Sequence, residues 1–127
     1  MKKIAVVFVI LSILLLLCGC DTYYFDYENL KETVQKIEII DYDSFTREER
    51  LLKVLVESDR NQFLLELSQI EYHFFLGDPP TTKGYAIKLN YKNNDCEIIT
   101  WAGTTKQGFI KCDKELFEEM LREYYPN

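Results

Sequence analysis

The chain contains a single histidine, His73, and lacks the short motifs that indicate common enzymatic chemistries. It has no Gly-rich phosphate loop, no His-Glu-x-x-His, no Gly-x-Ser-x-Gly and no Cys-x-x-Cys pair. His73 lies in the aromatic run 71–75, where a lone histidine is more often a packed or edge residue than a ligand or a base. No two acidic residues have a spacing that singles out a general acid and its base. We therefore expect no catalytic residue, no metal site and no cofactor.

An excess of positive charge is also absent. The chain has 15 Lys and Arg against 21 Asp and Glu, which gives a formal net charge of -6. Because an acidic surface repels phosphate groups, nucleic acid is not an expected partner. The same repulsion disfavours flat binding to anionic lipid, so a membrane-bound form of this chain would need a separate anchor.

The first twenty residues have the organisation of a secretory signal. Lys2 and Lys3 precede the apolar run Ile4–Leu17, and small and thiol side chains follow at 18–20. The apolar run is shorter than the roughly 20 residues that a membrane-spanning helix requires. An uncleaved anchor, the alternative, would have to include 18–20 as well, and Asp21 blocks any further extension.

The sequence Leu17-Cys18-Gly19-Cys20 closely resembles the lipobox of bacterial lipoproteins. This resemblance implies a diacylglyceryl group on the Cys20 sulfur and cleavage between Gly19 and Cys20. It also implies that the mature chain is held by its lipid on the outer, extracytoplasmic face of the cell membrane. The stretches 84–91 and 94–100 are loosely similar to small lipoproteins of Gram-positive bacteria, a similarity that implies no activity.

Three regions follow from this interpretation: a signal peptide at 1–19, a lipid-anchored tether at 20–33 and one domain at 34–127. The length suits a single core rather than two. The tether carries the aromatic residues Tyr23, Tyr24, Phe25 and Tyr27 and lacks the Gly and Ser content of a flexible linker. Its rings would lie either at the lipid headgroups or folded back on the domain core.

The hydrophobic patterns predict an α+β domain, with two helices on an antiparallel sheet of about five strands in the order β-β-α-β-β-β-α. Strands are expected at 34–42 and 52–56, and a helix is expected from Ser58 or Asp59 to Ile70. A second helix, capped by Asp113, would bury Leu116, Phe117, Met120, Leu121 and Tyr124.

Between the helices, 84–112 reads as a three-stranded meander whose first turn is a two-residue hairpin at Asn93-Asn94. That hairpin pairs Leu89 with Ile98, and a second turn near 103–106 sets Cys96 opposite Cys112. Since Cys18 leaves with the signal and Cys20 carries the lipid, this remaining pair is a candidate disulfide. The alternative is two free buried thiols.

The same register places Ile99, Trp101 and Phe109 on the second face of the meander. An apolar patch of this kind with a polar rim is typical of contact surfaces for proteins, peptides or glycans. The alternative is that another element covers this face. A non-catalytic binding module with an envelope protein, peptide or glycan partner is the first function class. An accessory subunit of a membrane complex and a small envelope enzyme are the alternatives.

Overall fold

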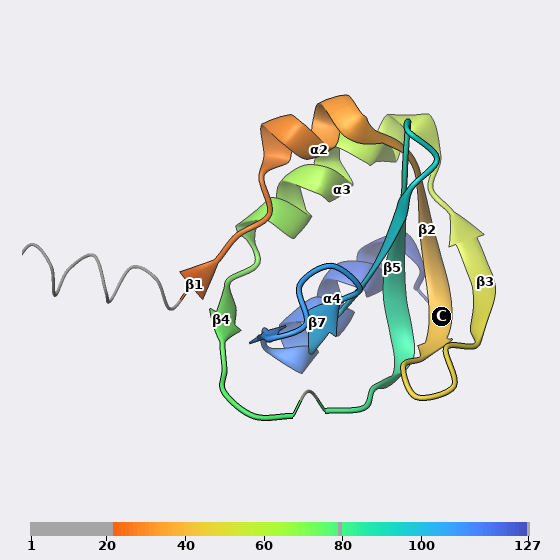
Figure 1. The fold of residues 1–127 in the computed structure, drawn as a ribbon. Coiled ribbons are helices and arrows are strands. Elements are labelled where there is room, and N and C mark those ends of the chain that lie inside the picture. The colour runs from red at the N-terminus through yellow and green to blue at the C-terminus, as the bar shows by residue number, and fades with distance from the viewer. Residues whose placement is uncertain (1–21, 79, 127) are drawn as a thin grey trace, which may run out of the picture.

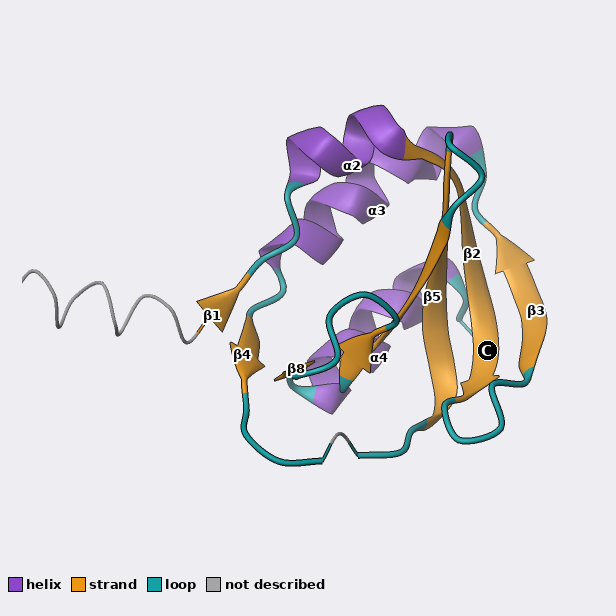
Figure 2. Ribbon diagram, in the orientation of Figure 1, coloured by secondary structure: helices purple, strands orange, loops and turns teal. Residues whose placement is uncertain are grey.

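The computed structural model describes residues 22–78 and 80–126 (Figures 1 and 2). Within these residues the chain forms three helices and eight strands, and the strands make two antiparallel sheets. This confirms the α+β class with antiparallel strands. No helix in the described ranges is long and apolar enough to cross a membrane.

The larger sheet has five strands in the order β3-β2-β5-β6-β7. Its long central pair is β2 and β5, which run antiparallel along almost their full lengths. The bounds of the five strands are β2 Val34–Asp43, β3 Glu49–Val54, β5 Lys83–Tyr91, β6 Cys96–Thr100 and β7 Gly103–Thr104.

The smaller sheet has the strand order β1-β4-β8 and joins three segments that are far apart in sequence. Its strands are β1 Thr22–Tyr23, β4 Tyr72–Phe74 and β8 Ile110–Lys111. Figure 1 shows β1 and β4 together at one side of the molecule, across from the loop between β2 and β3.

The helices are α2 Tyr27–Thr33, α3 Glu57–Gln69 and α4 Lys114–Tyr124. Asp26 and Asp113 cap α2 and α4, and each side chain accepts hydrogen bonds from backbone N–H groups of the first turn. The cap of α4 at Asp113 confirms the prediction. In contrast, α3 begins at Glu57 after Val56, which makes no side-chain cap, so the expected cap at Ser58 or Asp59 is wrong.

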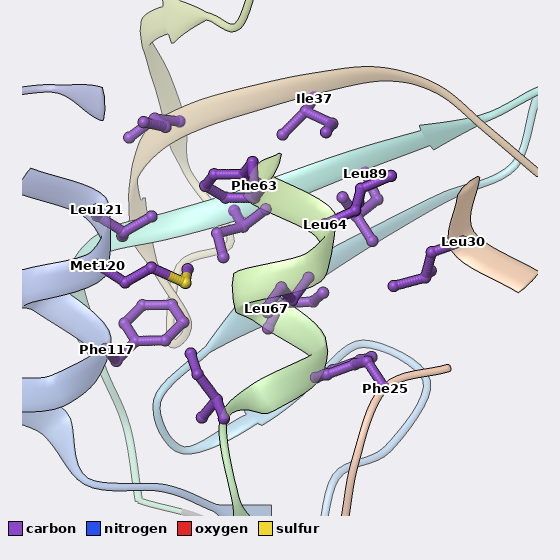
Figure 3. Packing of buried hydrophobic residues seen from close by; sticks show 14 of the residues in the cluster. Phe25, Leu30, Ile37, Phe63, Leu64, Leu67, Leu89, Phe117, Met120 and Leu121 are labelled. Atoms are coloured by element: carbon purple, nitrogen blue, oxygen red, sulfur yellow. The ribbon is translucent and has the colours of Figure 1, made fainter. Parts of the chain in front are cut away.

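All three helices bury side chains in one hydrophobic core against one face of the larger sheet (Figure 3). Leu30 comes from α2, Phe63 and Leu64 from α3, and Phe117 and Leu121 from α4. The sheet contributes alternate residues of its central strands, as expected for a half-buried sheet: Ile37, Ile39, Ile87, Leu89 and Ile99.

The structure has one helix and one sheet more than the sequence pattern predicted. The segment 22–33, expected to be a tether, forms β1 and α2 instead. Phe25 and Leu30 are 5% and 4% exposed and belong to the core. The second of the two alternatives for these aromatic residues, folding back on the domain, therefore holds for Phe25, whereas Tyr24 is exposed.

The register of the β5–β6 hairpin differs by one residue from the prediction. Leu89 lies opposite Glu97, and Lys88 lies opposite Ile98. The connection is the loop Lys92–Asn94, in which Asn94 has a φ of 69°. This left-handed residue adds one residue to the expected turn. Because side chains alternate along a strand, the shift moves each β6 side chain to the opposite face.

Candidate binding site

The register shift places the carboxylate of Glu97 on the core face of the larger sheet, beside a pocket of about 500 Å³. The pocket lies between α2, the start of the described chain and the ends of the β5–β6 hairpin and the β7–β8 loop. Its lining combines aromatic, aliphatic, charged and polar side chains, and the residues used below are Tyr23, Phe25, Leu30, Tyr91, Glu97 and Lys106.

Glu97 is 5% exposed, although it is an acidic residue. The Tyr91 hydroxyl donates a hydrogen bond of 2.6 Å to its Oε1 atom. The described residues provide no other hydrogen bond to this carboxylate, so one neutral donor serves two oxygens. A carboxylate with so little exposure is costly unless it is paired, and Lys106 is the cationic side chain whose charge interacts with that of Glu97.

Electrostatics in the pocket follow from this carboxylate. Burial, the hydrogen bond to Glu97 and its negative charge raise the pKa of Tyr91 well above its usual range. Burial and the charge of Glu97 also raise the pKa of Tyr23. Both phenols therefore stay neutral at physiological pH.

An ammonium group already lies on one aromatic surface of this pocket. Lys106 Nζ is 4.5 Å from the centroid of the Tyr91 ring and 2.7 Å from Asp95 Oδ2. The ring quadrupole attracts a cation at this distance. An aromatic wall next to a partly desolvated carboxylate is suited to binding a positively charged ligand group.

The predicted patch of Ile99, Trp101 and Phe109 does not form. Ile99 is fully buried and packs in the core, because the register shift turned it toward the helices. Trp101 is half-buried and packs against the same core. Phe109 is 58% exposed and lies next to Phe75 of the β4 region, with the two ring centroids 6.5 Å apart.

Cys96 and Cys112, the candidate disulfide, are both free cysteines in the structure, and the register that would set them opposite each other does not form. β6 pairs with β7 through Ile99 and Thr104, and the short β8 pairs with β4 in the other sheet. Cys96 is therefore exposed at the hairpin, whereas Cys112 is buried. Burial raises the pKa of the Cys112 thiol to about 11.

His73 lies on β4 with an exposed side chain, and its Nε2 atom is 3.8 Å from Glu71 Oε1. Neither residue lines the Glu97 pocket. Within the described ranges, no group of three His, Cys, Asp or Glu side chains is arranged to hold a metal ion. Cys20, the predicted lipidation site, lies outside the described residues.

Comparisons with protein-family models, with curated proteins and with solved structures gave no match for this chain. The function is therefore inferred from the pocket and from the N-terminal sequence.

Proposed function

We propose that this protein is a lipid-anchored, non-catalytic binding module on the extracytoplasmic face of the cell membrane. The anchor is supported by the lipobox-like sequence that ends at Cys20. The binding function is supported by one observation, the pocket in which the little-exposed carboxylate of Glu97 lies beside aromatic side chains and accepts a hydrogen bond from the neutral Tyr91 hydroxyl.

The ligand group that fits this pocket is a cation, such as the ammonium of a lysine side chain in an envelope protein or peptide. Glu97 supplies the opposite charge, and Tyr23 and Phe25 supply aromatic surface. Lys106 lies over the Tyr91 ring, so a ligand cation would have to displace this ammonium or bind beside it. An accessory subunit would use the same pocket for a basic side chain of its membrane partner. The pocket favours binding over an envelope enzyme, because His73 is not among its lining residues.

The binding proposal is tested by NMR titration of the detergent-solubilised protein with Nα-acetyl-lysine N-methylamide. We expect saturable shifts at Tyr91, Glu97 and Lys106. Replacing Glu97 by Gln removes the charge but keeps the shape, and binding should weaken about tenfold or more, since a charge-assisted hydrogen bond contributes roughly 1.5–3 kcal/mol.

Glu119→Gln, on the exposed surface of α4, is the matched control and should bind as the unsubstituted protein does. The norleucine analogue of the probe, which lacks the ammonium, should give no saturable shift. Equal binding of the two probes, or unchanged binding by Glu97→Gln, contradicts the proposed ligand chemistry.

The anchor is tested by fractionating cells that express the full chain. Cys20→Ser removes the sulfur that would carry the lipid, so the protein should move from the membrane fraction to the soluble fraction. Cys96→Ser is the control, because this exposed thiol has no part in anchoring, and it should leave the distribution unchanged. A Cys20→Ser protein that stays with the membrane rules out the lipid anchor.

A further inference from the structure

The smaller sheet presents a face that combines aromatic and cationic side chains. Thr22, His73 and Lys111 are paired across β1, β4 and β8 and so share one face. Phe75 lies two residues after His73 of β4, and Phe109 lies two residues before Lys111 of β8, so both belong to the same face. We call these five residues, Thr22, His73, Phe75, Phe109 and Lys111, the outer aromatic face.

Contacts within this face bind its members together. The Phe75 N–H donates a hydrogen bond to the Phe109 carbonyl at 3.0 Å, and the two rings are in contact. Lys111 Nζ lies 5.5 Å from the centroid of the Phe75 ring. The side chains are thus organised on the outside of the sheet, whereas Tyr72, on its inner side, is fully buried.

The outer aromatic face is largely open to solvent within the described structure. Phe109 is 58% exposed, and the adjoining Leu76 is fully exposed. The side chain of His73 is 56% exposed. Exposed aromatic side chains next to cationic ones are typical of protein surfaces that contact a membrane. The rings lie at the level of the headgroups, and the charged ends of the side chains remain in water.

Chain length connects this face to the proposed anchor. Thr22 is only two residues beyond Cys20, and two residues span at most about 7 Å. Thr22 is itself a member of the outer aromatic face, through its pairing with His73. A lipid on Cys20 therefore brings this face, and no distant part of the molecule, to the bilayer.

We propose that the outer aromatic face lies against the bilayer surface, with Phe75, Phe109 and the adjoining Leu76 among the lipid headgroups. Lys111 meets the lipid phosphates, which lessens at this face the repulsion expected of a chain whose formal net charge is -6. The domain is then held in one orientation by two contacts, the lipid and the aromatic face. This inference rests on the proposed lipid anchor.

The test uses the full, lipidated chain reconstituted into phosphatidylcholine vesicles that contain 20% phosphatidylglycerol and a lipid with a nitroxide near its headgroup. Trp101→Phe removes the only tryptophan, and Phe109→Trp then places a fluorophore on the outer aromatic face. Nitroxide lipid should quench this tryptophan strongly, by about half or more. The matched control places the tryptophan at Phe45, which is 81% exposed in the loop between β2 and β3 on the opposite side of the molecule, and quenching should be weak (Figure 1).

Each result has a distinct meaning. Strong quenching at 109 and weak quenching at 45 supports the orientation. Equal quenching at both positions in a protein that remains on the vesicles overturns the orientation but leaves the anchor intact. If the chain carries no lipid, and Cys20→Ser does not change how much of the protein is found in the membrane fraction, the anchor and this inference are overturned together. Circular dichroism of both variants confirms that the fold is retained.

Discussion

At the scale of single residues, several polar side chains are buried among apolar ones, and their protonation states affect the stability of the fold. Glu97 is buried with one hydrogen bond from Tyr91, and the Tyr72 hydroxyl donates to the Thr100 carbonyl at 3.0 Å. The Cys112 thiol is buried beside them. Such groups are stable only in the protonation state that the interior favours, so the stability of the fold depends on pH.

We predict that the protein loses stability as the pH rises above about 9. Burial raises the pKa of Cys112 from 9.0 to about 11, and burial also raises the pKa of Tyr72 and Tyr91. These groups ionise more readily in the unfolded chain, so their contribution is complete below pH 9 and is lost as the pH passes through the folded-state values. With about 1.4 kcal/mol per pKa unit, ionisation of Cys112 should lower the free energy of unfolding by roughly 1–2 kcal/mol at pH 10.5, relative to pH 8.

Urea unfolding at pH 8 and pH 10.5 measures this loss. Cys112→Ala should reduce the difference between the two pH values, because only the tyrosines then contribute. Cys96→Ala, at an exposed position, should leave the difference as it is. Identical pH dependence in the two variants would show that the buried thiol does not contribute.

At the scale of elements, the short segments were the hardest to predict. β2 and α4 have long apolar patterns, and both form where the sequence indicates. In contrast, β1 and α2 contain two and seven residues. Segments this short show no clear hydrophobic periodicity, so the sequence could not distinguish them from a tether rich in aromatic residues. Asp26 ahead of Leu30 was the available signal, since a capping residue before an apolar position marks a helix start.

We predict that α2 is part of the cooperative fold. Leu30→Ala removes a side chain that is 4% exposed in the core and should cost about 2–5 kcal/mol of unfolding free energy. Guanidinium unfolding at pH 7 provides the measurement. Leu116→Ala, on a residue of α4 that is 50% exposed, should cost well under 1 kcal/mol. If both variants lost equally little, α2 would be an appendage and not part of the core.

At the scale of the whole molecule, two sheets and three helices share one core, and the pocket and the outer aromatic face lie where distant segments meet. Residue Tyr23 illustrates this arrangement. It pairs with Tyr72 in the smaller sheet, and it also lines the Glu97 pocket. The proposed bilayer contact and the proposed ligand site are thus neighbours, joined by the first strand of the described chain.

Local periodicity and capping were enough to predict the α+β class, the long strand β2 and the capped helix α4 from the amino-acid sequence. It also carries the lipobox-like pattern on which the proposed anchor depends. The faces of β6 could not be predicted in this way, since one left-handed residue, Asn94, moved Glu97 to the pocket and Ile99 into the core. Register and the pairing of distant strands depend on contacts between segments far apart in sequence, and a local pattern does not specify them.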